Sequence, residues 1–258
     1  MPRALVTGAA KRLGREMALN LAARGHDVAV HCHGSAQEAE ETAAEIRALG
    51  RQAAVLQADL LDEAETTALV GCAAKALGGP LDVLVNNASI FEYDNIHTAS
   101  RSSWDRHMGS NLRAPFVLIQ EFARQAPKAE RGSGQPRARA LVVNMVDQRV
   151  LKPTPEFMTY SLAKAALWSL TRTAAQALAP DIRVNAIGPG PTLQGTRQTE
   201  SHFTRQRAAT ILERGADPQE ICAALNYLLD AVSVTGQLLC VDGGQHLGWK
   251  TPDVLGPE

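Results

Sequence analysis

Short apolar runs alternate with longer stretches of helical periodicity along the whole chain, and this alternation limits the possible folds more than any other sequence feature. The apolar runs predict strands at residues 4–6, 27–31, 52–57, 81–85, 140–145, 182–187 and 238–242. The stretches between them predict helices at residues 13–24, 35–49, 62–77, 102–125, 159–178 and 218–229. Apolar strands that alternate with helices are typical of parallel sheets covered on both faces. The sequence therefore predicts an α/β fold with a doubly wound, seven-stranded parallel sheet flanked by helices.

The length and the charge of the chain restrict its organisation and its partners. A chain of 258 residues with 45% hydrophobic residues suits one large domain, so we expect a single domain over residues 1–258. The formal net charge is −1, and no basic run is longer than a pair. Such a surface offers no electrostatic footprint for nucleic acid or for an anionic membrane. We expect the partners to be small molecules and copies of the same chain.

The cysteines are scattered, without CxxC spacing and without nearby histidine clusters; they are Cys32, Cys72, Cys222 and Cys240. This pattern argues against disulfides and zinc and for a reducing cytosol. The chain enters its first predicted strand directly after Met1, and no apolar run approaches membrane-spanning length. We therefore expect a cytoplasmic protein without a metal site.

Two segments interrupt the alternation. Residues 127–139 are polar and rich in Pro and Gly, which predicts a surface loop before the fifth strand. The irregular stretch from Pro189 to about Arg205 follows the sixth strand, where open α/β sheets bind ligands beyond the carboxyl ends of their strands. We expect residues 191–205 to form a substrate lid.

A glycine-containing turn, residues 7–14, joins the first strand to the first helix. Gly8 and Gly14 would let the backbone approach phosphate groups, and the N-terminus of a helix favours their negative charge. A glycine turn alone is weak evidence. Its place between a strand and a helix makes a dinucleotide site the better interpretation than a plain turn.

The end of the second strand indicates which dinucleotide binds. An NAD site usually has an acidic residue there to bind the ribose hydroxyls, but none occurs between Val30 and Gln37. This chain has His31, His33 and Ser35, and Arg12 can approach from the glycine turn. A guanidinium, two imidazoles and a hydroxyl suit a 2′-phosphate, so the predicted cofactor is NADPH. The alternative is that both histidines are ordinary strand-end residues.

Tyr160 and Lys164 are four residues apart on a predicted helix and so project from one face, where the ammonium can lower the pKa of the phenol. Asp147 lies thirteen residues before Tyr160. A carboxylate repels the oxyanion that forms when a ketone is reduced, whereas it accepts from the N–H groups of a nitrogen heterocycle. Asp147 therefore favours reduction of a C=N bond. The alternative is that Asp147 only caps the turn after the fifth strand.

These motifs resemble the short-chain dehydrogenase/reductase family over nearly the whole chain, which implies a single-domain Rossmann fold. Gly8 and Gly14 match its TGxxxGxG turn, residues 86–89 match its NNAG segment, and residues 189–192 resemble the segment that holds the nicotinamide carboxamide. The resemblance implies further cofactor residues in addition to those of the glycine turn and the second strand, which are Gly8, Arg12, Gly14, His31, His33 and Ser35. The further residues are Leu13, Asp59, Leu60, Asn87, Ala88, Ser89, Tyr160, Lys164, Pro189, Gly190 and Thr192. The family usually has serine at the position of Asp147.

The departures from the general family pattern resemble its pteridine reductase branch, which includes dihydromonapterin reductases. They are Arg12, the HxHxS stretch from His31, Ser89 with Phe91, and Asp147. The resemblance implies that Phe91 and the nicotinamide sandwich a pterin ring and that Ser89 contacts both cofactor and pterin.

The same resemblance implies a mechanism. Hydride passes from the nicotinamide to a pterin C=N carbon, Tyr160 donates a proton to the adjacent nitrogen, and Lys164 holds the ribose hydroxyls. Asp147 orients Tyr160 and is a candidate proton donor for a fully oxidised pterin. Asn111 organises a water path to Lys164.

Two other functions stay open from the sequence. One is an NADP-dependent carbonyl or imine reductase acting on another small molecule, and the other is a non-catalytic dinucleotide sensor. A sensor needs no proton relay, so the presence of Tyr160, Lys164 and Asn111 argues against this function. The resemblance also implies a homotetramer built through the helices that carry Asn111 and Tyr160 and through the C-terminal strand.

Overall fold

The computed structural model describes residues 1–132, 134–195 and 197–250. Its strands form one seven-stranded parallel sheet in the order β3-β2-β1-β4-β5-β6-β7. The strands are β1 Arg3–Val6, β2 Asp27–Cys32, β3 Ala53–Gln57, β4 Val83–Asn86, β5 Ala140–Met145, β6 Ile182–Pro189 and β7 Leu238–Val241. The strand order reverses between β1 and β4, and ligands of such sheets bind at this point. The sheet confirms the predicted fold class.

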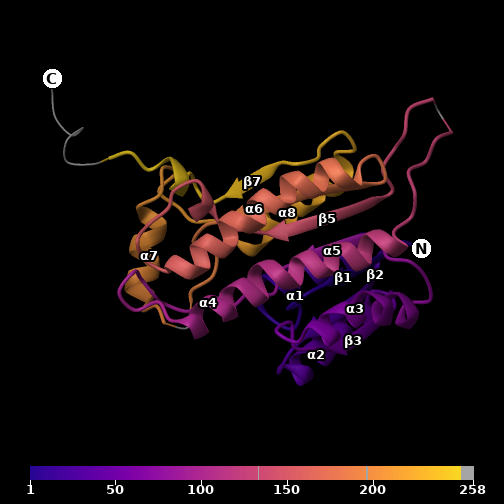
Figure 1. Cartoon of the computed structure of the whole chain (residues 1–258), viewed down its shortest axis with the longest axis horizontal. Helices are drawn as coiled ribbons and strands as arrows, with labels where there is room; N and C mark the ends of the chain where they lie inside the picture. The colour runs from indigo at the N-terminus through magenta and orange to yellow at the C-terminus, as the bar shows by residue number, and fades with distance from the viewer. Residues whose placement is uncertain (133, 196, 251–258) are drawn as a thin grey trace.

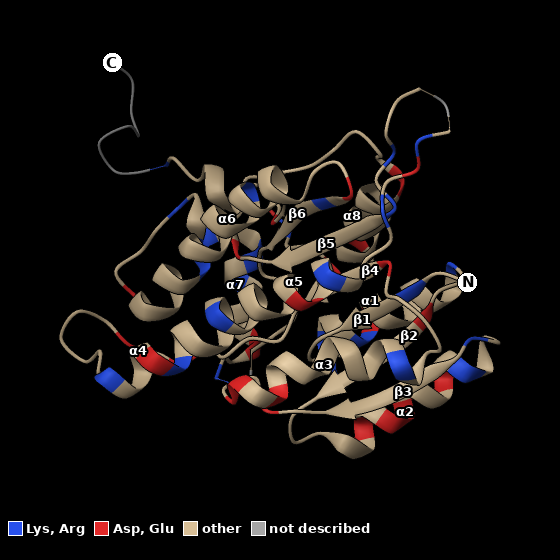
Figure 2. Cartoon of the chain, turned by 45° about the vertical axis from the view of Figure 1, so that its right-hand side comes forward, with Lys and Arg blue, Asp and Glu red and all other residues tan. Residues whose placement is uncertain are grey.

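Helices cover both faces of the sheet (Figure 1). They are α1 Arg12–Ala23, α2 Ala36–Ala48, α3 Glu63–Ala76, α4 Arg101–Met108, α5 Ala114–Gln125, α6 Met158–Leu178, α7 Glu200–Ala208 and α8 Pro218–Asp230. Helix α1 packs between α2 and α8 on one face, while α5 packs between α3 and α6 on the other. Acidic and basic residues are interspersed along these outer helices, with acidic residues frequent on α2 (Figure 2).

Alternate residues of each central strand enter different cores. Ala4 and Val6 of β1 pack under α1 and α8, whereas Leu5 between them packs under α3 and α5. Successive side chains of a strand point to opposite faces, so a strand buried on both faces is apolar at every position. Both cores hold the strands in place, and the carboxyl ends of β1, β4 and β5 are thereby fixed relative to one another.

The helix predicted at residues 102–125 is interrupted in the structure. A π-helical turn, Gly109–Arg113, separates α4 from α5 and carries Asn111. Gly109 lies close to Leu61. A Cβ atom on Gly109 would be only 2.9 Å from Leu61 Cδ2. A π turn inserts a residue into the helix and changes the direction of the side chains beyond it. Helical periodicity alone did not predict it.

Both irregular segments contain some regular structure. Residues 200–208 of the predicted lid form α7, which begins with the Thr199 hydroxyl accepting from His202 N–H. Thr196 of the lid lies outside the described residues. In the loop at 127–139, Glu130 and Arg137 pair as an antiparallel bridge, and Ser133 lies outside the described residues. The lid is therefore only partly irregular, which corrects the prediction.

No helix in the described ranges is both long and apolar enough to cross a membrane. Within the same ranges, no cluster of three or more His, Cys, Asp or Glu side chains is arranged to hold a metal ion.

Candidate active site and cofactor cleft

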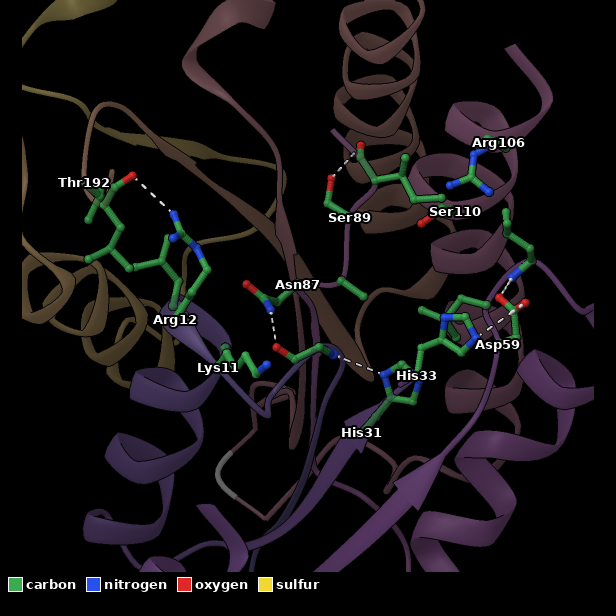
Figure 3. Close-up of a pocket in the computed structure, with 18 of the residues that line it drawn as sticks. Lys11, Arg12, His31, His33, Asp59, Asn87, Ser89, Arg106, Ser110 and Thr192 are labelled. Carbon is green, nitrogen blue, oxygen red and sulfur yellow. Dashed lines mark hydrogen bonds and ion pairs between the residues drawn. The ribbon is translucent and has the colours of Figure 1, made fainter. Parts of the chain in front are cut away.

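A cavity of about 620 Å³ lies at the carboxyl ends of β1, β2, β3 and β4. Thr192 and Arg12 lie at one end of it, and His33, Asp59 and Arg106 at the other (Figure 3). The predicted cofactor residues in its wall are Gly8, Arg12, Leu13, Gly14, His31, His33, Asp59, Leu60, Asn87, Ala88, Ser89, Gly190 and Thr192. Ser35, Pro189, Tyr160 and Lys164 are not part of this wall. Most of the predicted cofactor set thus shares one cavity.

The glycine turn forms a cradle that a side chain would fill. Gly8 has a left-handed backbone, with φ of 62°, and a Cβ on Gly14 would be 2.2 Å from the Gly8 carbonyl oxygen. Asn87 Nδ2 donates to the carbonyls of Thr7 and Gly8 at 2.8 and 3.1 Å and so fixes the turn against β4. The backbone is left open to a phosphate-bearing group at the start of α1. These residues therefore fit a dinucleotide.

Arg12 contacts the lid instead of the end of β2, which corrects its predicted role. Its guanidinium donates to the carbonyl oxygens of Gln194 and Leu193 at 2.9 and 3.2 Å. Its own φ of 55° is in the left-handed region, which is unusual for a residue other than glycine. Arg12 consequently ties the glycine turn to the first residues of the lid.

His31 is structural, so its predicted contact with a phosphate is also corrected. Nδ1 accepts from the Gly8 N–H at 3.1 Å, and Nε2 lies 3.1 Å from the Ala58 carbonyl oxygen. The side chain is only 2% exposed, and burial lowers its pKa. A buried ring with both nitrogens bound to backbone stays neutral. The interpretation as a strand-end residue holds for His31.

His33 and Lys11 also line the cavity. His33 is exposed, with Nε2 3.9 Å from a carboxylate oxygen of Asp59. Lys11 also lines the cavity, and its ammonium lies 2.5 Å from Glu38 at the start of α2. Lys11 was not predicted from the sequence, although a basic residue next to Arg12 in the glycine turn was the available signal. Lys11 and His33 therefore offer an ammonium and an imidazole to a phosphate beyond β2.

Asp147 caps the turn after β5, as one predicted alternative has it, and also contacts Tyr160; its catalytic role stays a prediction. Oδ1 accepts from the Arg149 N–H at 2.9 Å, which caps the turn after β5, and Oδ2 accepts from the Tyr160 hydroxyl at 2.9 Å. Burial raises the pKa of the Asp147 carboxyl, although its hydrogen bond to Arg149 N–H opposes the shift. The turn therefore holds the carboxyl group against the phenol.

Lys164 does not lower the pKa of Tyr160 in this geometry, contrary to the prediction. Its ammonium donates to the Met145 carbonyl at 2.7 Å and lies 5.7 Å from the centroid of the Tyr160 ring. Burial and the Asp147 carboxylate raise the pKa of Tyr160 well above its usual value. Burial lowers the pKa of Lys164 to about 8. Tyr160 is thus held in its protonated form, with its hydroxyl hydrogen-bonded to Asp147.

Asn111 holds the chain segment that follows β4. Its side chain is fully buried; Oδ1 accepts from the Ile90 N–H at 2.9 Å and Nδ2 donates to the Ile90 carbonyl at 2.8 Å. The next residue, Phe91, contacts Tyr160 edge to face, with ring centroids 4.6 Å apart. The predicted site residues Phe91, Tyr160 and Asp147 are therefore adjacent. The water path assigned to Asn111 stays a prediction.

The sequence analysis also missed residues that support Tyr160. His107 is fully buried; its Nδ1 is 2.6 Å from the Thr159 hydroxyl, and its Nε2 accepts from the Glu92 N–H at 3.1 Å. Thr159 in turn donates to Asp94. This network joins the segment after Phe91 to the start of α6. A lone histidine in a helix gave no sequence signal for it.

Phe157 is the last missed residue, and it faces Phe91. Their rings stack with centroids 4.3 Å apart and an interplanar angle of 11°. Phe157 has a left-handed backbone, with φ of 56°, immediately before α6. That conformation is uncommon for an aromatic residue and commonly marks functional sites.

Comparisons with known proteins agree with this geometry. A family model described as short chain dehydrogenase matches residues 2–206. The solved structure of FolM alternative dihydrofolate reductase 1 from Brucella suis, in complex with NADP, is 42% identical, has a TM-score of 0.91, and each chain covers 98% of the other. Pteridine reductase 1 from Leishmania tarentolae is 33% identical over 95% of this chain and 96% of that protein. The 3-oxoacyl-[acyl-carrier-protein] reductase FabG from Staphylococcus aureus strain Mu50 is 31% identical over 95% of this chain and 98% of that protein.

Proposed function

The chain belongs to the short-chain dehydrogenase family, and we propose that it is an NADPH-dependent reductase acting on a C=N bond of a pterin-like substrate. Family membership and the NADP complex of its structural neighbour make the chain an NADPH-dependent oxidoreductase. One observation carries the choice of substrate: the Asp147 carboxyl group is hydrogen-bonded to the Tyr160 hydroxyl beside the ring of Phe91. The relatives named for dihydrofolate and pteridine reduction support the same choice.

The cofactor would be held by the glycine turn, by the segment 87–89 after β4 and by Thr192. Bound there, it supplies the hydride. The Lys11 ammonium and the His33 imidazole line the cavity, and no acidic residue occurs between Val30 and Gln37 at the end of β2. A 2′-phosphate is attracted to such a site, whereas an acidic residue would repel it.

Tyr160 is the proton donor in this proposal. The phenol is protonated at neutral pH, and its hydrogen bond to Asp147 fixes the hydroxyl beside Phe91. A ring nitrogen that gains electrons becomes basic and takes the phenolic proton. Lys164 is buried beside the Tyr160 ring, where its ammonium donates to the Met145 carbonyl, and in this proposal it holds the ribose hydroxyls of the cofactor.

Asp147 selects against ketones for an electrostatic reason. A carboxylate next to Tyr160 repels the alkoxide that forms when a carbonyl is reduced, whereas a ring N–H can donate to it. The burial that raises the pKa of Asp147 also lets the carboxyl group take up a proton more readily than an exposed aspartate. A protonated Asp147 could donate to a second ring nitrogen of an oxidised pterin.

The test follows NADPH oxidation by the purified protein with dihydrobiopterin and dihydromonapterin, and with simple ketones for comparison. We expect turnover of the dihydropterins and little turnover of the ketones. Tyr160→Phe is the control, because it removes the proton donor but keeps the ring. Turnover of ketones alone would support the carbonyl reductase, and NADPH binding without any turnover would support the sensor; either result contradicts the proposal.

A further inference from the structure

Helix α6, which carries Tyr160, has no side-chain cap of its own at its N-terminus. The residue at the cap position is Phe157, whose apolar side chain accepts no hydrogen bond. The first N–H groups of a helix have no partner within the helix, and helix ends that are not held tend to fray. Tyr160 lies in this first turn, so the place of its hydroxyl depends on how the turn is held.

Asp94 supplies the missing cap from a segment that is distant in the sequence. Its Oδ1 accepts from the Thr159 N–H at 3.0 Å, and its backbone carbonyl accepts from the Met158 N–H at 3.3 Å. Burial alone would raise the pKa of Asp94, but the hydrogen bonds from Thr159 outweigh burial and hold the pKa below its usual value. The buried carboxylate is therefore charged, and it lies at the positive end of the helix dipole, where an anion is stabilising.

His107 completes a chain of hydrogen bonds that ends on this carboxylate. The Glu92 N–H donates to Nε2 at 3.1 Å, so the proton of the neutral ring lies on Nδ1. Burial lowers the pKa of His107 and keeps the ring neutral. Nδ1 then donates to the Thr159 hydroxyl at 2.6 Å, and this hydroxyl donates to Asp94 Oδ2. Because the chain is buried and runs in one direction, the loss of any member leaves a buried polar group without its partner.

These three side chains, called here the capping network, are Asp94, His107 and Thr159. They adjoin the phenol, since the His107 and Tyr160 rings meet edge to face with centroids 6.1 Å apart. None of the three is part of the wall of the cofactor cavity. A change in the capping network should consequently disturb the phenol and leave cofactor binding intact.

We infer that the capping network is a positioning device for Tyr160, which it holds on Asp147 in the geometry that proton transfer requires. This inference rests on the proposed function, because it takes Tyr160 to be the proton donor. The phenol reaches Asp147 at 2.9 Å only while the first turn of α6 keeps its place. A displacement of about 1 Å in a reacting group can cost about 100-fold in rate. The network residues act through Tyr160 and are not themselves catalytic.

The experiment compares two substitutions of Thr159. Thr159→Val removes the hydroxyl and keeps the shape and the N–H that Asp94 accepts, whereas Thr159→Ser keeps the hydroxyl. We expect kcat for dihydrobiopterin to fall about 10- to 100-fold in Thr159→Val and by less than about threefold in Thr159→Ser. Asp94→Asn removes the charge at the end of the chain and should lower kcat in the same way. The Kd of NADPH, measured by fluorescence titration, should stay unchanged in all three variants.

Fluorine NMR measures the environment of the phenol without turnover. The chain has only three tyrosines, so labelling with 3-fluorotyrosine gives a simple spectrum, in which Tyr160→Phe identifies the Tyr160 signal. We expect one sharp Tyr160 signal in the unmodified protein and in Thr159→Ser. In Thr159→Val and Asp94→Asn the signal should shift or broaden, because the first turn of α6 no longer holds one conformation.

Thr171→Val is the matched control, because Thr171 is also fully buried in α6. Its hydroxyl likewise has two partners: it accepts from Asn144 Nδ2 at 2.9 Å and donates to the Leu167 carbonyl at 2.8 Å. Thr171 lies about three helical turns beyond Tyr160. This variant should lose stability towards urea much as Thr159→Val does, and it should keep both kcat and the Tyr160 signal.

The outcomes separate the two proposals. If Thr159→Val and Asp94→Asn keep both kcat and the Tyr160 signal, the positioning role is refuted and the proposed function stands. If Thr171→Val lowers kcat and alters the signal to the same extent, the losses reflect general destabilisation and the inference is refuted as well. If the unmodified protein reduces no dihydropterin, the proposed function fails, while the fluorine signal still decides whether the capping network holds Tyr160.

Discussion

The two carboxylate oxygens of Asp147 make different hydrogen bonds, and a single substitution can separate the roles of these bonds. Asn at this position keeps an oxygen for the Arg149 N–H, so the turn after β5 should persist. It cannot donate a carboxylic proton. We expect Asp147→Asn to keep its affinity for NADPH and to lose about 100-fold or more in kcat for oxidised pterins, within the usual range of general acid catalysis.

Under the proposed mechanism dihydropterins take only the proton from Tyr160, so the same variant should lose much less turnover with them. Steady-state kinetics on both oxidation states of one pterin, with NADPH titration as the binding measurement, give the comparison. Equal losses on the two substrates would show that Asp147 only orients Tyr160.

Lys164 and Asp147 predict different pH profiles for the two oxidation states. Lys164 is charged below its pKa of about 8, so kcat/KM for dihydropterins should fall as the pH rises through this value. Under the proposed mechanism oxidised pterins also need a protonated Asp147, so their kcat/KM should show a second fall as the pH rises through the raised pKa of this carboxyl group, which dihydropterins should lack. Lys164→Arg should remove the fall near pH 8, because the guanidinium keeps its proton. A fall near pH 8 that persists in this variant would assign it to another group.

The site could be predicted from the sequence where spacing along the chain determines contact. Asp147 lies thirteen residues before Tyr160. Because Asp147 follows β5 and Tyr160 lies in the first turn of α6, the two side chains meet and form a hydrogen bond. The direction of Arg12 could not be predicted, because it depends on the carbonyls of a lid 181 and 182 residues away. His31 was misjudged for a similar reason, since Gly8 and Ala58 take up both ring nitrogens.

Strands and most helices were predicted within about two residues, because burial on both faces makes the strands continuous apolar runs and burial of one face gives the helices a period of 3.6. The π turn at 109–113 and helix α7 were not. The turn contacts Leu61 through Gly109 and Ile90 through Asn111, both distant in sequence, and α7 has no buried residue that would give it an apolar stripe. Elements without such a stripe carry no periodic signal.

The turn between β1 and α1 should tolerate no side chain at Gly14. A Cβ there would meet the Gly8 carbonyl at 2.2 Å and Asn87 Nδ2 at 2.5 Å. We expect Gly14→Ala to lower the free energy of unfolding by about 1–3 kcal/mol through overpacking and to weaken NADPH binding at least about tenfold. Urea unfolding and NADPH fluorescence titration measure the two effects.

Gly71 is the matched control, because it lies in α3 with nothing within 4 Å of its Cβ position. Gly71→Ala should raise the free energy of unfolding by about 0.5–1 kcal/mol and leave NADPH affinity unchanged. Normal NADPH binding by Gly14→Ala would contradict the assignment of the cradle to the cofactor.

The helices α4, α5 and α6 leave an apolar groove on the outside of the molecule, lined by Met108, Leu112, Phe116 and Leu170. We propose that this groove packs against copies of the chain in a homotetramer. Phe116 is 37% exposed in the single chain, so a charge there would be buried at such an interface. Light scattering after size exclusion should give a tetramer, and Phe116→Glu should give smaller species.

Leu49→Glu is the control for that substitution, because Leu49 is 52% exposed at the end of α2, away from the groove. It should remain tetrameric. A monomeric unmodified protein, or dissociation by both variants alike, would rule out the groove as the interface.

Reduction of a pterin C=N bond is tested most directly by following the hydride. The protein is incubated with dihydrobiopterin and NADPH deuterated on the transferred position, and the pterin product is analysed by mass spectrometry. We predict a tetrahydropterin that carries one deuterium on a ring carbon, formed by the unmodified protein and not by Tyr160→Phe. Recovery of unreduced dihydrobiopterin from protein that binds NADPH and reduces a ketone with the same label would contradict the assignment.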